Sequence, residues 1–285
     1  ATSANAVYQL LFAYTQYPES FGDKYDANGN EGANGIPDIL DEAKWGLDWL
    51  VKMNPDKDTY FNQLADDRDH VGMTIPSEQK VDYGWGAGNA RPVYFCSPKP
   101  QGLRQYKNRS TGLASTLGKY ASSFSLGSKV LANYYPEFSQ LIAQKAKDAY
   151  QKGMESPGVC QTACTVSPYF YEEDNWADDM QLAATEIYSL NKTMETLSQA
   201  VNYGRLEPVT PWMGADSARH YQWYPFINLG QYQLAKQNIN SRIGKEFIRN
   251  MRSGLQRVKD RAQGDAFLNG VPFIWCSNNL TVGLI

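Results

Sequence analysis

Residues 34–53, NGIPDILDEAKWGLDWLVKM, carry a full set of helix signals. Pro37 stands where a first-turn proline is tolerated, because the N–H group at that position has no partner inside a helix. Asp38 and Asp41 follow it and favour the positive end of the helix dipole. The apolar residues recur at three- and four-residue spacing and share one face: Ile39, Leu40, Ala43, Leu47, Leu50 and Val51. The stretch therefore predicts an amphipathic helix over 38–53.

Helical periodicity continues along most of the chain, and strand-type alternation is rare and short. It predicts further helices at 3–16, 111–133, 136–153, 175–189, 193–203, 223–236, 240–262 and 272–285. Long polar loops separate them at 54–110, 154–174 and 204–222. Paired helices that alternate with long loops predict an all-α toroid whose loops build a cleft at one end. No linker or short repeat divides the chain, so we expect one domain over 1–285.

Charge and hydropathy exclude several classes of protein. The net charge of −3 gives no electrostatic reason to expect binding to nucleic acid or to an anionic membrane. No run approaches ~18 consecutive apolar residues, so no membrane span is predicted, and no secretory signal is visible. Both ends of the chain, Ala1 and Ile285, stand inside helical or apolar patterns, and we expect a piece of a longer protein.

Aromatic residues are abundant, with 7 Trp and 19 Tyr. The apolar C–H faces of sugar rings stack on such side chains, which suits a carbohydrate cleft. The alternative is that most of these rings pack in the core, as large rings usually do.

The four cysteines are Cys96, Cys160, Cys164 and Cys276. Cys160 and Cys164 flank a short loop, so they form either a local disulfide or free buried thiols. A zinc site is not predicted, because the chain has only two histidines and no second close cysteine pair.

Two acidic segments stand out. Residues 61–70, FNQLADDRDH, place three aspartates, an arginine and a histidine in one loop, which is either a binding loop or a solvated acidic turn. Residues 172–179 contain five acids, and these repel one another unless they are protonated, paired or bound to a metal. Carboxylates are the ligands that Ca²⁺ prefers. The alternative is that the acids only favour a helix N-terminus.

Two later segments combine aromatic and polar residues. Residues 212–224 bring Trp, His, Tyr and Arg together as a binding platform or as a packed loop corner. Residues 273–279, FIWCSNN, place a tryptophan close to two asparagines at the start of a predicted helix.

The stretch NGIPDILDEAKWGLDWL resembles the signature of glycoside hydrolase family 9, the inverting cellulases and related β-glucanases. The resemblance implies an (α/α)6 barrel, incomplete in this chain, with an open cleft for a β-glucan polysaccharide or oligosaccharide. The 61–70 loop is similar to a family stretch that holds a histidine against the sugar. The residues implied to bind substrate are His70, Trp176, Trp212, His220, Tyr221, Trp223, Trp275 and Asn279, the last standing where the family has arginine.

The same resemblance implies a structural Ca²⁺ site. Asp178 and Asp179 match the Asp-Glu pair of a calcium-binding segment, and Asp174 falls at its serine. Asp179 replaces the family's glutamate and has a shorter reach.

The catalytic carboxyls of the family are not found in this sequence. Inversion needs an acid and a base roughly 6.5–9.5 Å apart. The base belongs to an Asp-x-x-Asp-Tyr motif that this chain lacks, and the acid is a glutamate usually found beyond a helix like the last one here. We therefore assign no catalytic residue and expect both carboxyls to lie outside the chain.

The leading hypothesis is hydrolysis of β-1,4-glucosidic bonds in cellulose or related β-glucans by an inverting mechanism. The alternative is a non-catalytic glycan-binding protein of the same fold, favoured by the missing acid and base. A polysaccharide lyase is disfavoured by the net acidity, and a serine hydrolase by the lack of a Gly-x-Ser-x-Gly elbow. The family resemblance implies an extracellular or periplasmic location.

Overall fold

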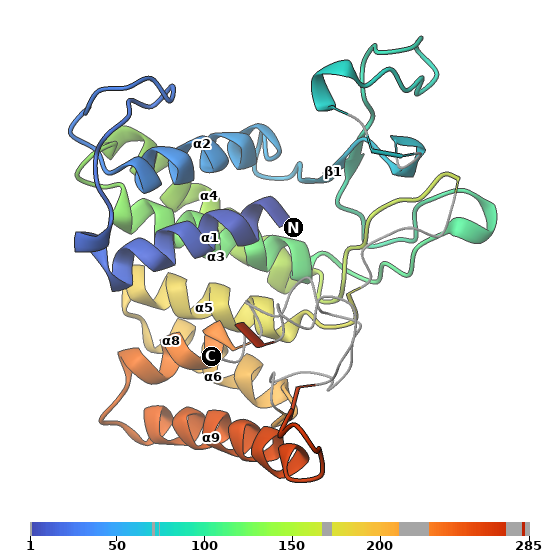
Figure 1. The fold of residues 1–285 in the computed structure, drawn as a ribbon. Helices are drawn as coiled ribbons and strands as arrows, with labels where there is room; N and C mark the ends of the chain where they lie inside the picture. The colour runs from blue at the N-terminus through green and yellow to red at the C-terminus, as the bar shows by residue number, and fades with distance from the viewer. Residues whose placement is uncertain are drawn as a thin grey trace.

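The computed structural model describes residues 2–69, 72–73, 75–166, 173–210, 228–271 and 281–282. These residues form a helical molecule with a small antiparallel β-ribbon (Figure 1). Its helices are α1 (Thr2–Gln16), α2 (Asp38–Lys52), α3 (Ala114–Val130), α4 (Pro136–Glu155), α5 (Ala177–Asn191), α6 (Met194–Leu206), α8 (Leu229–Gln237) and α9 (Arg242–Ala262). The ribbon pairs β1 (Phe61–Leu64) with β2 (Val93–Phe95).

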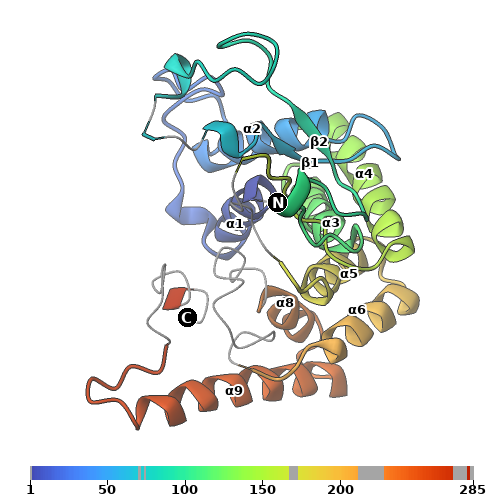
Figure 2. The same cartoon turned by 90° about the vertical axis from the view of Figure 1, so that its right-hand side faces the viewer.

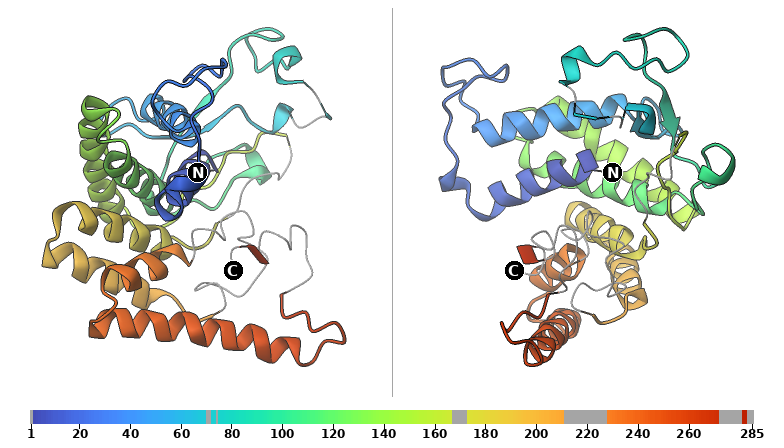
Figure 3. Two further views of the ribbon diagram at one scale, coloured as in Figure 1. Left: turned by 60° about the vertical axis from the view of Figure 1, so that its left-hand side comes forward. Right: turned by 45° about the vertical axis from the view of Figure 1, so that its right-hand side comes forward.

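Helices α1, α3, α5 and α8 pack one against the next, with α3 near the centre, and α2, α4, α6 and α9 each pack mainly on one of them. Helix α3 contacts α1, α2, α4 and α5, while α5 continues the packing to α6 and α8, and α8 contacts α9. Figure 3 shows the long helix α9 along the edge of the molecule opposite α2. The largest fully buried side chains include Tyr8, Leu11, Leu40, Leu47, Leu117, Phe124, Leu131 and Phe247.

Helix α3 is buried on almost every side because its residues are small. Residues 114–128 are all buried, and most are alanine, serine, glycine or threonine. At Gly118 the backbone of α5 comes so close that an added Cβ would lie 2.8 Å from the carbonyl carbon of Asp179. Small side chains therefore bring α3 and α5 into direct backbone contact.

Most of the predicted helices are confirmed within a few residues. The segment predicted at 38–53 is α2, Asp38–Lys52, and the segment predicted at 111–133 is α3, Ala114–Val130. The described part of the segment predicted at 223–236 is α8, Leu229–Gln237. The predicted helix at 272–285 lies outside the described residues apart from 281–282. None of the described helices is long and apolar enough to cross a membrane.

Two long connections lie at one end of the helices, whereas the 17–37 connection between α1 and α2 lies at the other end. The 54–110 segment carries the β-ribbon and several short 3₁₀ turns there, and the 156–166 segment lies beside it (Figures 1 and 2). This loop-rich end is the place where the sequence predicted a cleft.

The described cysteines carry free thiols. Cys160 and Cys164 are both buried and unbridged, so the free-thiol alternative is confirmed and the local disulfide is wrong. The Cys160 thiol instead hydrogen-bonds with the Cys96 thiol and accepts from Asn62 Nδ2 at 3.3 Å. Cys276 lies outside the described residues.

Candidate functional site

A cavity of about 260 Å³ opens at the loop-rich end, between α1, α2, β1, α3 and the residues Cys160, Thr162 and Glu173. Aromatic side chains of Trp49, Phe61 and Tyr120 form part of its wall, and Asn62 and Glu173 add polar atoms. Aromatic faces beside amide and carboxylate groups suit a ligand that has apolar faces and hydroxyl edges.

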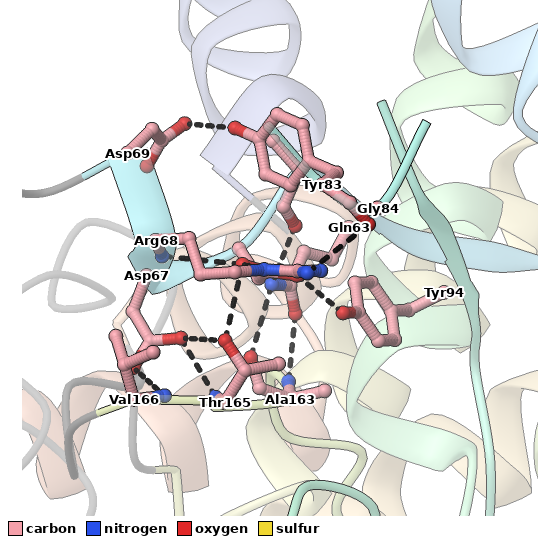
Figure 4. Close-up of polar contacts among 12 residues, drawn as sticks. Gln63, Asp67, Arg68, Asp69, Tyr83, Gly84, Tyr94, Ala163, Thr165 and Val166 are labelled. Carbon is pink, nitrogen blue, oxygen red and sulfur yellow. Dashed lines mark hydrogen bonds and ion pairs between the residues drawn. The ribbon is translucent and has the colours of Figure 1, made fainter. Parts of the chain in front are cut away.

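Two residues after β1, Asp66 is buried in a network of donors, of which Figure 4 labels Arg68 and Tyr94. Arg68 donates from Nε to Oδ1 at 2.8 Å and from Nη2 to Oδ2 at 2.6 Å. Tyr94 donates its hydroxyl to Oδ2 at 2.5 Å. Burial raises the pKa of Asp66, but the hydrogen bonds from Arg68 and Tyr94 outweigh it and lower the pKa to about 2. Asp66 is therefore an anion, held by hydrogen bonds from Arg68 in the same loop and from Tyr94.

Asp67 joins this loop to a segment almost a hundred residues later in the chain. Its carboxylate accepts from Thr165 N at 2.7 Å, from Thr165 Oγ1 at 2.9 Å and from Val166 N at 3.2 Å. Gln63 makes a second link, because it exchanges two hydrogen bonds with the backbone of Ala163, at 2.7 and 3.1 Å. Figure 4 shows both links side by side.

The end of the 61–70 loop is held by Tyr83. The Arg68 guanidinium lies 5.0 Å from the centre of the Tyr83 ring and donates to its carbonyl at 3.1 Å. The Tyr83 hydroxyl donates to Asp69 Oδ2 at 3.0 Å. Burial, together with this contact to Asp69, raises the pKa of Tyr83 to about 12. The hydrogen bond from Tyr83 thus fixes the position of Asp69, the residue before His70.

The alternative of a solvated acidic turn is wrong for this loop, because Asp66 is 3% exposed and Asp67 is 4% exposed. His70 itself lies outside the described residues. Its role in sugar contact stays a prediction.

A second acidic cluster lies at the first turn of α5. Asp178 and Asp179 are almost fully buried, and Glu173 is 4% exposed. Their counter-charge is Lys119 of α3, whose Nζ lies 2.6 Å from Glu173 Oε1 and 2.5 Å from Asp179 Oδ2. In the part of the chain that the structure describes, the Oδ1 atoms of Asp178 and Asp179 have no hydrogen-bond partner.

Burial dominates the electrostatics of this cluster. It raises the pKa of Asp178 to about 6, against the opposing charge of Lys119, and it raises the pKa of Asp179 as well. Glu207, which accepts from Asn175 Nδ2 at 3.0 Å, has its pKa raised to about 9 by burial and by the charge of Asp178. Glu207 is therefore a protonated carboxyl at neutral pH.

The described residues do not fit the implied Ca²⁺ site. Asp174 is exposed, whereas Asp178 and Asp179 are buried, and one oxygen of Asp179 is bonded to an ammonium. Within the described ranges, no three His, Cys, Asp or Glu side chains are placed to hold one metal ion. Lys119 already supplies a positive charge at this point, and a cation would be repelled by it.

Trp176 is half-buried beside this cluster, with its ring packed edge-on against Tyr203 at a centroid distance of 6.0 Å. It does not line the cavity described above. The other residues predicted to bind substrate lie outside the described residues: Trp212, His220, Tyr221, Trp223, Trp275 and Asn279.

Sequence reasoning missed several residues that the structure brings together, above all Lys119, Tyr94, Thr165 and Glu207. Lys119 did leave a signal. It is a single cation in the run ASTLGKYASS, whose other residues are small, apolar or aromatic, and such a helix is buried on all faces. Tyr94 and Thr165 left none, because they are far from Asp66 and Asp67 in the sequence.

The model of the family described as "Glycosyl hydrolase family 9" matches residues 1–283. Similar sequences include "Endoglucanase C" of Cellulomonas fimi, 26% identical over 72% of this chain, and "Cellulose 1,4-beta-cellobiosidase" of Acetivibrio thermocellus, 28% identical over 81%. These matches cover 16% and 25% of the two relatives, so the chain spans only a part of their length.

Solved structures share the fold. A metagenome-derived glycoside hydrolase family 9 endoglucanase superposes with a TM-score of 0.68 over 99% of this chain and 47% of its own, at 22% identity. The endoglucanase of the termite Nasutitermes takasagoensis gives 0.60 over 88% and 49%, at 18% identity. The prediction of an all-α fold of the (α/α)6 type is confirmed by this likeness.

Proposed function

Because the chain belongs to glycosyl hydrolase family 9, we propose that the protein hydrolyses β-1,4-glucosidic bonds in cellulose or related β-glucans. The observation that carries the proposal is the family match over residues 1–283. The cavity supports it, because Trp49, Phe61 and Tyr120 offer rings for stacking beside polar groups for sugar hydroxyls.

We further propose that bond cleavage is by single displacement and that the acid and base come from outside these 285 residues. The described carboxylates near the cavity are already engaged. Asp66 is bonded to Arg68, Asp67 to Thr165 and Glu173 to Lys119. A general base must be free to accept a proton from water, so these groups suit the positioning of loops better than proton transfer.

The 61–69 loop then has a specific task in this proposal. Asp67 and Gln63 fix it to the 163–166 segment, and Tyr83 fixes its end through Asp69. His70 follows directly and would be presented to a sugar from a rigid support. We also propose an extracellular or periplasmic location, because a polymeric glucan is a substrate found outside the cytoplasm.

The alternative, a non-catalytic glycan-binding protein of the same fold, is supported by the same engaged carboxylates. The two functions make opposite predictions for turnover and the same prediction for binding. Reducing-sugar release from carboxymethylcellulose and mixed-linkage β-glucan should therefore be measured for this chain and for a version extended at both ends. Activity of only the extended version supports the hydrolase, and binding without activity in either version supports the alternative.

The cavity can be tested separately by calorimetric titration with cello-oligosaccharides. We expect Trp49→Ala to weaken binding about tenfold, the loss of one stacked ring or roughly 1.4 kcal/mol. Trp45→Ala is the matched control, because Trp45 is on the same helix, is 69% exposed and does not line the cavity. Equal effects of the two substitutions would remove the cavity from the proposal.

A further inference from the structure

Lys119 is a fully buried cation in the interior of the helical bundle. Its side chain is 0% exposed, and its Nζ contacts Glu173 Oε1, Asp179 Oδ2 and the carbonyl of Ser115, the last at 3.3 Å. An ammonium has three N–H donors, and the described residues offer it these three acceptors. The buried charge of Lys119 is therefore paired and hydrogen-bonded within the bundle.

Close packing of α3 against α5 brings the Lys119 ammonium to the acidic residues at the start of α5. Gly118, the neighbour of Lys119, lets α3 approach the backbone of α5 at Asp179, where any Cβ would collide. Asp178 and Asp179 are in the first turn of α5, and Glu173 lies just before it. The close crossing places the side chain of Lys119 directly at the N-terminal end of α5.

We infer that the Lys119 ammonium is the internal cation of this acidic cluster, used in place of a bound metal ion, and that it positions Glu173 on the cavity wall. This inference does not depend on the proposed function. It concerns how the chain neutralises buried carboxylates and fixes the segment that enters α5.

Glu173 is held both at its carboxylate and at its backbone carbonyl. Its carboxylate is bonded to Lys119, and its carbonyl accepts from Gln161 Nε2 at 3.0 Å. Gln161 in turn accepts from the backbone N–H of Arg109 at 2.8 Å. Because Glu173 lines the cavity, the ammonium connects the core of the bundle to the cavity wall.

A metal ion and this ammonium are mutually exclusive at Asp179. Ca²⁺ binds carboxylate oxygens at about 2.3–2.6 Å, the region that Nζ already occupies. The Oδ1 atoms of Asp178 and Asp179, which have no hydrogen-bond partner among the described residues, are oxygens that a metal could use. The experiment must therefore ask whether the protein binds a metal with Lys119 present and whether it does so once Lys119 is removed.

The first measurement is the thermal midpoint of the unmodified protein in EDTA and in 5 mM CaCl₂, together with Tb³⁺ luminescence. We expect the midpoint to be the same in both buffers to within about 1 °C and no stoichiometric Tb³⁺ signal, because a cation that does not bind cannot shift the transition. A lower midpoint in EDTA, or one calcium ion per chain by elemental analysis, would overturn the inference.

The second measurement uses Lys119→Ala. In EDTA we expect the midpoint to fall by about 10 °C, because buried carboxylates lose their counter-charge. In 5 mM CaCl₂ we expect about half of that loss to be restored, with a Tb³⁺ signal, since the emptied site now attracts a cation. Destabilisation without any metal response would show a purely packing role and would contradict the inference.

Lys129→Ala is the matched control. Lys129 is on the same helix and pairs across the same α3–α5 contact, with Glu186 at 2.6 Å, but its side chain is 32% exposed. We expect a smaller fall in the midpoint and no response to calcium, because this site has one carboxylate.

If Lys119→Ala does not fold, a variant with uncharged side chains at these positions tests the inference instead. Lys119→Met combined with Glu173→Gln and Asp179→Asn removes the cation and the two carboxylates that contact it. We expect this variant to fold and to be insensitive to EDTA and calcium. If it also fails to fold, or if it responds to calcium, charge balance is not the role of Lys119.

Discussion

The acidic cluster around Asp66 and the acidic cluster at the first turn of α5 lie at the same end of the molecule. They shift the pKa values of their carboxyl groups in opposite directions. Asp66 is surrounded by donors from Arg68 and Tyr94, and its pKa falls to about 2. Asp178 has fewer donors, and burial raises its pKa to about 6. Both residues are at most 3% exposed. At Asp66 the hydrogen bonds from Arg68 and Tyr94 outweigh the effect of burial on the pKa. At Asp178, which is buried more deeply, burial and the charge of Glu173 outweigh the opposing charge of Lys119.

The two clusters also differ in what they hold together. Asp66 and its neighbours join loops at the surface of the cavity, whereas the α5 cluster joins two helices in the core. The first depends on side-chain hydrogen bonds and the second on close backbone packing. Substitutions in the two clusters should therefore differ in how much they lower the free energy of unfolding and in how that loss depends on pH.

The largest expected effect is on the packing of the α5 cluster. Gly118→Ala would put a Cβ 2.8 Å from the backbone of Asp179, and neither helix can move without breaking the Lys119 contacts. We expect a loss of about 3 kcal/mol in the free energy of unfolding, measured by urea denaturation. Gly127→Ala is the control, because its Cβ would meet the flexible ends of two side chains, Leu47 Cδ1 at 2.7 Å and Ile142 Cδ1 at 3.2 Å, and no backbone atom closer than these. We expect that control to cost less than about 1 kcal/mol, and equal costs would contradict the packing argument.

A slightly smaller effect is expected at Arg68. Arg68→Ala leaves the buried Asp66 without its charged partner, and we expect a loss of roughly 2–3 kcal/mol in unfolding free energy. Arg205→Ala is the matched control, since Arg205 makes an equally bidentate contact with Glu246, with both bonds at 2.8 Å. The Arg205 side chain is 55% exposed, so we expect its loss to cost less than about 1 kcal/mol. Similar costs for the two arginines would show that burial of Asp66 is not what matters.

The sequence predicted the helical elements well, because their signals are local. Asp38, the apolar spacing after it and the last-turn Lys52 define α2 without any tertiary information. The role of Lys119 was visible only in part, as a single cation in a helix of small residues. Its partners Glu173 and Asp179 are more than fifty residues away, and periodicity cannot pair them.

The loop contacts were harder to predict for the same reason. Asp67 to Thr165 and Gln63 to Ala163 each connect residues about a hundred positions apart. Nothing in the pattern FNQLADDRDH distinguishes a buried aspartate from a solvated one. The resemblance to a known family identified the loop as important, but the contacts that make it rigid required the structure.

A third prediction concerns acid. The pKa of Asp66 is about 2 in the folded protein against an ordinary value of 3.8, so folding favours its charged form. Its contribution to stability is therefore complete above pH 4 and is lost as the pH falls from about 4 to about 2, an amount of about 2 kcal/mol. Asp66→Asn should lack this component. The difference in unfolding free energy between the two proteins should shrink over that pH window, and a constant difference would contradict the pKa shift.

The smallest effect is expected at Tyr94. Its substitution removes an uncharged hydrogen-bond donor to Asp66 and leaves the charged donor, Arg68, in place. Tyr94→Phe removes one donor, at 2.5 Å, but leaves both bonds from Arg68, so we expect a loss of about 1 kcal/mol at neutral pH. Tyr150→Phe is the control, because the Tyr150 hydroxyl donates to a neutral amide, Gln199 Oε1, at 2.8 Å. We expect the Tyr94 effect to fade below about pH 2, where Asp66 is protonated, and the Tyr150 effect to be independent of pH. If both losses are independent of pH, the ionised state of Asp66 contributes nothing to the Tyr94 bond.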